Sequence, residues 1–137
     1  MTITVLDEAR GAAAAPLLER GYKIVEARAD EHFGDALLLL TRDDVLVRVL
    51  KERGQWFVEI GADGNEWFDA WVVLRAIGDT GSYAPPVDEA GVKEFVETLA
   101  NSTAQWQVCF HETLYPTFRK QLHSLETASS KERFGYP

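Results

Sequence analysis

The chain is poor in the residues from which disulfide frameworks and metal centres are built. Its 137 residues include one cysteine, one methionine and three histidines. A single cysteine cannot form an internal disulfide, which favours a reducing, cytoplasmic location. No apolar run reaches the roughly 18 residues that a membrane helix needs, and the first residues lack the basic region of a signal peptide. These absences predict a cytoplasmic protein without a membrane partner.

Basic residues are also scarce, with 14 Lys and Arg against 22 Asp and Glu and a net charge of −8. Residues 61–102 hold eight acidic and two basic residues, so −6 of the net charge falls there. Nucleic acid is excluded as a partner because phosphate binding needs a basic face. A basic protein partner is favoured instead. The alternative is that the excess acid only keeps the protein soluble.

Length and composition indicate one domain spanning residues 1–137. Apolar residues make up 46% of the chain and aromatic residues 11%, which is enough for a single core. No internal repeat or linker divides the chain. The polar residues 129–137 are predicted to be a frayed tail.

Alternating apolar residues and turn signals predict a four-stranded antiparallel meander. Asp43-Asp44 and Arg53-Gly54 mark the hairpin turns, and short connections favour antiparallel neighbours. Residues 36–41 form a continuous apolar run, which is typical of a central strand or of a strand covered on both sides. The four predicted strands are residues 22–28, 36–41, 45–51 and 55–60.

Helices are predicted both before and after the strands in the sequence. A first helix begins at Asp7 and runs toward Arg20. After the sheet the apolar period changes to 3.6, which predicts helices over residues 68–77 and from Asp88 onward. A last helix, kinked or divided at Pro116, buries apolar residues spaced nearly four apart. These residues are Trp106, Phe110, Leu114, Phe118, Leu122 and Leu125. The fold class is therefore α+β, with an N-terminal helix and two to three C-terminal helices packed on one face of the sheet.

Two short motifs are similar to catalytic signatures, but neither is complete. Residues 79–82 read DTGS, the signature of aspartic proteases, yet they follow a helical pattern rather than an apolar strand. His111-Glu112 begins the zinc motif HExxH, but Tyr115 stands where the second histidine is required. We therefore predict no catalytic residues.

The remaining reactive side chains do not form a recognisable site. Cys109 lies between apolar residues of the last helix, which is typical of a packed structural thiol. A metal site of His32, His111 and His123 is left open, although scattered histidines are usually unrelated. We predict no metal and no cofactor.

The acidic stretch supplies the candidate binding residues. Asp63, Glu66 and Asp69 surround Trp67 at the start of a helix, where negative charge also favours the helix dipole. Asp79, Asp88 and Glu89 bound the following loop. If the fold gathers these side chains on one rim, they form an acidic patch with an aromatic centre. Such a patch suits a basic protein, because charge speeds encounter and an aromatic anchor supplies affinity. The predicted partner-binding residues are Asp63, Glu66, Trp67, Asp69, Asp79, Asp88 and Glu89.

Three segments carry a resemblance to a known group of proteins. They are FGDALLLL at 33–40, RGQWFVEIG at 53–61 and EWFDAWVVLRAIG at 66–78. Together they resemble a family of small bacterial proteins, some of which are similar to the immunity proteins of toxin–immunity pairs. The resemblance implies a protein that binds and neutralises a cognate toxin, commonly a nuclease, without catalytic residues of its own.

Two classes of function follow. The first is a non-catalytic binding module, an immunity- or antitoxin-like inhibitor that covers a basic toxin with acidic residues. The second is a small-molecule site or small enzyme with a pocket between sheet and helices, lined by Tyr83, Trp56, His111 and Glu112. A self-associating structural protein is a third option.

Overall fold

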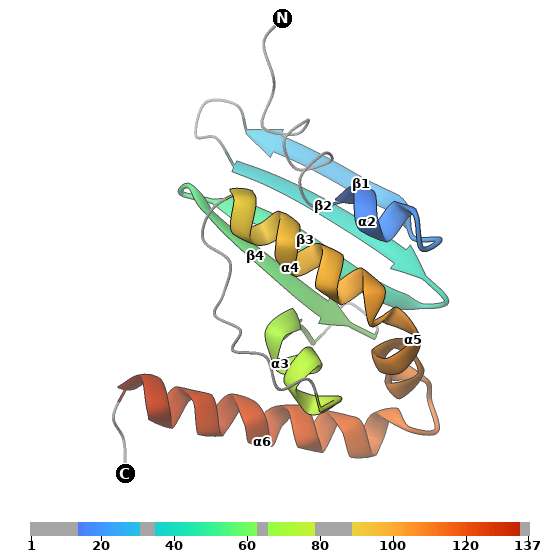
Figure 1. Cartoon of the computed structure of the whole chain (residues 1–137), viewed down its shortest axis with the longest axis vertical. Coiled ribbons are helices and arrows are strands. Elements are labelled where there is room, and N and C mark those ends of the chain that lie inside the picture. The colour runs from blue at the N-terminus through green and yellow to red at the C-terminus, as the bar shows by residue number, and fades with distance from the viewer. Residues whose placement is uncertain (1–13, 31–34, 63–65, 79–88, 135–137) are drawn as a thin grey trace, which may run out of the picture.

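In a computed structural model, the protein is an α+β fold described over residues 14–30, 35–62, 66–78 and 89–134 (Figure 1). Over these residues a short helix comes first, five strands follow, and the remaining elements are helices. The strands are β1 (Lys23–Asp30), β2 (Asp35–Arg42), β3 (Val45–Glu52), β4 (Gln55–Gly61) and β5 (Phe68–Asp69). The helices are α2 (Ala15–Leu18), α3 (Ala70–Ala76), α4 (Glu89–Asn101), α5 (Thr103–Trp106), the 3₁₀ helix η2 (Gln107–Phe110) and α6 (Tyr115–Phe134).

The antiparallel meander is confirmed, and local turn chemistry explains it. The strands follow one another across the sheet in chain order, all antiparallel. Asp43 and Asp44 have φ of 49° and 68°, and Arg53 and Gly54 have φ of 52° and 79°. Two successive left-handed residues make the tight turn whose twist matches an antiparallel hairpin. Both predicted hairpin turns are thus present.

The sheet has two different faces, because side chains alternate along each strand. One face is buried beneath the helices: α2 and α4 lie across it, while α3 and α6 lie beyond β4 (Figure 1). The buried face carries Leu38, Leu40, Val45, Val47, Val49, Trp56, Val58 and Ile60. The opposite side, called the open face below, carries the half-buried Leu37, Leu39, Leu46, Arg48, Leu50, Phe57 and Glu59.

Trp106 joins the helical layer to the sheet. Its side chain is fully buried, and its indole N–H donates to the Leu99 carbonyl at 2.9 Å. Its ring stacks on Tyr22, with centroids 6.3 Å apart. Next to it, the Tyr22 hydroxyl donates to Gln107 at 2.9 Å, and Gln107 donates to the Arg42 carbonyl at 3.0 Å. Burial raises the pKa of Tyr22, as expected of a phenol that acts only as a structural donor.

A fifth strand corrects the predicted four. Phe68 and Asp69 pair with Ile60 and Glu59 before helix α3 begins, so the helix starts two residues later than its apolar pattern predicts. Phe68 is buried. Its apolar side chain would be buried whether residue 68 lay in a strand or in a helix, so the apolar pattern does not distinguish the two. The first helix is also shorter in the described residues, where α2 covers only Ala15–Leu18; residues 7–13 lie outside them.

The last predicted helix is divided, as Pro116 indicates, but the break lies before Pro116 and not at it. Residues 111–114 form a turn, and Pro116 falls in the first turn of α6, where its missing N–H leaves no helical hydrogen bond unmade. Leu114 lies in that turn and is 47% exposed, so its predicted burial is wrong.

Helix α6 packs against α3 rather than on the sheet, with Phe118 and Leu122 as its buried residues. Its narrow apolar stripe covers a helix and not a broad sheet face. The helix continues to Phe134, past the point where a frayed tail is predicted, because no glycine or proline follows Pro116 before Gly135. Among the described residues, no helix has the length and apolarity that crossing a membrane requires.

Candidate acidic binding site

Glu66 is the centre of the candidate site. It follows β4 in the chain and precedes Trp67 and β5, and its carboxylate faces α6. Arg119 donates to it twice, from Nε to Oε1 at 2.5 Å and from Nη2 to Oε2 at 3.0 Å. The Tyr115 hydroxyl donates to Oε1 at 3.4 Å. This two-pronged pair fixes the carboxylate in one orientation and ties the β4–β5 connection to α6.

The ion pair shifts the pKa of both of its partners. The hydrogen bond from Arg119 is the main cause of a lowered pKa for Glu66. The same bond raises the pKa of Arg119. Glu66 therefore stays ionised, and its negative charge is largely neutralised within the molecule.

Two further groups extend this site along α6. His123 Nε2 lies 3.0 Å from Glu66 Oε2, and His123 Nδ1 lies 3.7 Å from Glu126 Oε1. The imidazole packs edge-on against Phe68, with centroids 5.1 Å apart. His123 thus connects two carboxylates and is held in place by a buried ring. Glu66, Asp69 and Glu126, with Arg119 and His123, are called the acidic corner below.

Negative charge is in excess at the acidic corner. Partial burial raises the pKa of the Glu126 carboxyl; His123 lowers it, and the carboxylates of Asp69 and Glu66 raise it again. The Glu126 side chain is 38% exposed, so it is still open to a partner. A carboxylate that resists ionisation beside like charges is stabilised by any added cation.

An aromatic side chain stands beside the acidic corner, although it is not free. The ring of Trp67 lies against Gly61, and the Arg48 guanidinium sits over it at 4.1 Å from the ring centroid. Arg48 also donates to Glu59, from Nη2 at 2.6 Å. Trp67 therefore packs against Gly61 of β4 and Arg48 of β3, on the open face of the sheet.

Comparison with family models, with curated proteins and with solved structures finds no match for this chain. The resemblance to immunity proteins therefore stays a prediction, and function is inferred from the geometry of the site.

The structure brings together part of the predicted acidic patch. Glu66 and Asp69 lie at the acidic corner, with Trp67 beside them. Asp63, Asp79 and Asp88 fall outside the described residues. Glu89 begins α4, but its side chain is likewise outside the described part.

Sequence reasoning missed the contribution of α6. Tyr115, Arg119, His123 and Glu126 recur at spacings of four, four and three, which places them along one helix face. This polar stripe is visible in the sequence, but nothing local shows that it faces Glu66. The contact between Glu66 and Arg119 spans 53 positions of the chain.

The incomplete motifs gain no support from the described residues. His111 and Glu112 are exposed in the turn before α6, so they do not share a helix face. Residues 79–82 and His32 lie outside the described part, and within that part no group of three His, Cys, Asp or Glu side chains has an arrangement that could hold a metal ion. Burial raises the pKa of the Cys109 thiol, which keeps it protonated and a poor nucleophile.

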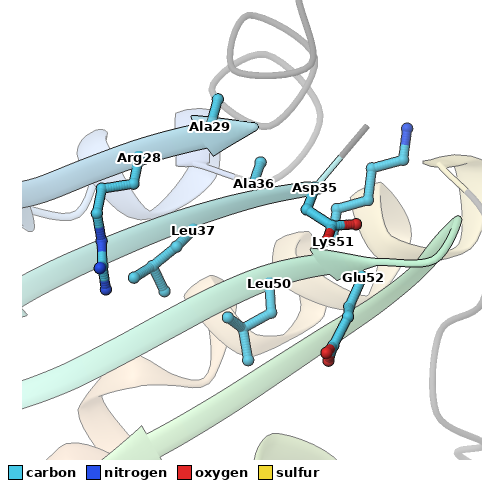
Figure 2. Close-up of a pocket in the computed structure, with 8 residues that line it drawn as sticks. All are labelled: Arg28, Ala29, Asp35, Ala36, Leu37, Leu50, Lys51 and Glu52. Carbon is cyan, nitrogen blue, oxygen red and sulfur yellow. The ribbon is translucent and has the colours of Figure 1, made fainter. Parts of the chain in front are cut away.

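The predicted pocket between sheet and helices is not assembled from its described residues. Trp56 is 2% exposed and packed in the core, whereas His111 and Glu112 face solvent. Tyr83 lies outside the described residues. A cavity of about 550 Å³ instead lies at the end of the open face, between Arg28, Leu37, Leu50 and Glu52 (Figure 2).

We expect Glu66→Gln to lower the free energy of unfolding by about 1 kcal/mol at neutral pH, since the pair is bidentate but partly exposed. A lowered pKa in the folded state stabilises the fold above the ordinary glutamate pKa of about 4.3. The difference between variant and wild type should therefore be full at neutral pH and shrink as the pH falls through the lowered pKa. Urea denaturation across this range measures it.

The matched control is Glu97→Gln, which removes an exposed carboxylate on α4. It should leave the stability within about 0.5 kcal/mol of wild type at every pH. A Glu66→Gln protein with the same flat profile would show that the contact with Arg119 does not stabilise the fold.

Proposed function

We propose that the protein is a non-catalytic protein-binding module, an immunity-like inhibitor that binds a basic protein through the acidic corner. The observation that carries this proposal is the approach of two carboxylates to His123: Glu66 Oε2 lies 3.0 Å from its Nε2, and Glu126 Oε1 lies 3.7 Å from its Nδ1. Burial and the carboxylates of Asp69 and Glu66 raise the pKa of Glu126, although His123 lowers it. A Lys or Arg of a partner placed here would supply the missing positive charge and relieve the repulsion.

The fixed carboxylate of Glu66 would make the acidic corner a pre-organised target. Because Arg119 holds it in one orientation, a partner cation would meet a site whose side chains need little further ordering. The net charge of −8 would add long-range attraction and speed the encounter with a basic surface. The proposal requires no cofactor and no nucleic acid, and it fits a cytoplasmic protein.

A small-molecule site is the second candidate function. The cavity at the end of the open face has a volume within the usual range of ligand pockets, roughly 300–1,000 Å³. It is lined by side chains of both charges, including Arg28, Asp35 and Glu52, and its described lining residues include no histidine or cysteine. This cavity would bind a ligand rather than supply paired groups for acid–base chemistry.

Capture of a partner from native lysate tests the proposed function when it is combined with charge reversal. Wild type should retain one basic protein in equal amount, and added salt should release it because exposed charges are screened. Asp69→Lys/Glu126→Lys should weaken that complex by about tenfold or more, as expected when attraction becomes repulsion.

The matched control is Glu97→Lys, which reverses an exposed charge on α4 away from the acidic corner. It should bind the same partner nearly as well as wild type. Equal loss in the control and in the double variant would point to net charge alone. A complex that tolerates Asp69→Lys/Glu126→Lys would contradict binding at this site.

A further inference from the structure

The cavity at the end of the open face has an apolar floor. Leu37 of β2 lies directly opposite Leu50 of β3, and Arg28 of β1 lies on the other side of Leu37. Both leucine side chains are half-buried, and Figure 2 shows them pointing the same way from the sheet. Because cross-strand neighbours have Cβ atoms about 4.5–5.5 Å apart, the two leucines form one continuous surface. This floor suits the apolar body of a ligand.

Two carboxylates stand side by side at one end of this floor. The strand register, one step beyond the pair that Ala36 forms, sets Asp35 of β2 opposite Glu52 of β3 on the open face. Like charges that lie directly opposite each other on neighbouring strands repel. Asp35 Oδ1 accepts a hydrogen bond from the backbone N–H of Arg53 at 3.0 Å. Within the described part of the chain, neither carboxylate has an ion-pair partner.

The two basic residues among the described lining of the cavity are engaged elsewhere. The Lys51 ammonium lies 5.4 Å from the centroid of the Trp56 ring, which belongs to the buried face of the sheet. Figure 2 shows the Lys51 side chain extending away from the two leucines. Arg28 Nε lies 2.9 Å from Glu26 Oε1, so this guanidinium already has a carboxylate partner. The charge of the cavity that is left to be compensated is therefore negative.

We propose that this cavity binds an amphipathic amine, a small molecule that carries an ammonium group at one end of an apolar body. The ammonium group would lie between Asp35 and Glu52, where one positive charge relieves the repulsion of two negative charges. The apolar body would lie along Leu37 and Leu50, toward Arg28. The inference rests on the second candidate function, the small-molecule site, and gives that site a class of ligand. It does not depend on the acidic corner.

Size and charge favour this class of ligand over a simple ion or an anion. A volume of about 550 Å³ is that of a site for an organic molecule, and the leucine floor offers no contact to a bare cation. An anion would find only the paired Arg28 and would be repelled by the two carboxylates. The net charge of −8 also raises the concentration of cations near the protein and lowers that of anions.

Titration of the full chain with phenethylamine, followed through the chemical shifts of the backbone amides, tests the proposal. Phenethyl alcohol and hydrocinnamate carry the same ring with a neutral and with a negative head group. The amine should bind with a dissociation constant of about 1 mM, the order expected of so small a ligand, and should shift the amides of residues 35–37 and 50–52. The alcohol and the carboxylate should bind at least about tenfold more weakly.

The variant Asp35→Asn/Glu52→Gln removes both charges and keeps the shape of the side chains. The asparagine retains an oxygen that can accept the Arg53 N–H, so the variant is expected to fold. It should bind phenethylamine no more tightly than phenethyl alcohol, a loss of about tenfold. The matched control is Glu94→Gln/Glu97→Gln, which removes two exposed carboxylates of α4 and changes the net charge equally. The control should keep the preference for the amine.

The outcomes separate the class of ligand from the existence of the site. Alcohol or carboxylate bound as tightly as the amine would overturn the proposal and leave a small-molecule site of another kind. No saturable shift with any of the three probes would overturn the site as well. Asp35→Asn/Glu52→Gln protein that binds the amine like wild type would also overturn the proposal. Asp69→Lys/Glu126→Lys should bind the amine as wild type does, because the acidic corner takes no part.

Discussion

Gly61→Ala is expected to lower the free energy of unfolding by roughly 1–3 kcal/mol, the usual cost of overpacking. A Cβ atom at this position would lie 2.7 Å from the backbone oxygen of Glu66 and 3.3 Å from the Trp67 ring. The first contact involves backbone, so it cannot be relieved by a side-chain rotation. The connection between β4 and β5 must therefore move, and Glu66 with it.

The same change should weaken the site as well as the fold. Displacement of Glu66 would disturb its two-pronged contact with Arg119, so partner binding should fall together with stability. Guanidinium denaturation and a binding measurement on one preparation check both effects. Gly54→Ala is the comparison, because its Cβ would meet nothing within 4 Å but its φ of +79° disfavours alanine. It should cost only about 1 kcal/mol and leave binding unchanged. A Gly61→Ala protein as stable as wild type would show that the close approach is not required.

Trp106→Ala should have the largest effect on stability, about 3–5 kcal/mol. The side chain is fully buried, stacks on Tyr22 and meets Phe110 edge-on at 6.3 Å. Its removal leaves a cavity and takes the indole donor from the Leu99 carbonyl, which keeps the Ser102 N–H at 3.2 Å. Because small domains are stable by only about 5–15 kcal/mol, much of the protein would be unfolded at moderate temperature.

Trp106→Phe separates packing from hydrogen bonding at this position. It keeps an aromatic ring but loses the indole N–H, so a smaller loss of roughly 1–3 kcal/mol is expected. Leu114→Ala serves as the surface control and should change stability by less than about 0.5 kcal/mol. Thermal and denaturant unfolding of the three variants ranks their stabilities. Equal stability of Trp106→Ala and Leu114→Ala would contradict the role given to this anchor.

The parts of the fold that could be predicted from the sequence are those determined locally. Alternating residues define the strands, and two pairs of turn residues determine the hairpins. The fifth strand could not be predicted, because Phe68 has the same burial in a strand as in a helix. Leu114 keeps the four-residue spacing of the last helix, yet a turn over residues 111–114 removes it from the core.

The candidate site was predicted only in part for a related reason. The acidic side chains of residues 66–69 are close in sequence, so their gathering is a local property. Their counter-ions come from α6, more than fifty positions later, and their position depends on how α6 packs against α3. The open face is similar: each leucine is visible in the sequence, but the meander must be assembled before they form one surface.

The most direct test of binding at the acidic corner is hydrogen–deuterium exchange of the protein with and without its captured basic partner. We expect slower exchange on binding at residues 66–69 and 119–126, where Glu66, Asp69 and Glu126 converge. Exchange along the open face should be the same in the bound and in the free protein. Protection confined to the cavity between Arg28 and Leu50, with none in α6, would contradict this account and favour a ligand site there.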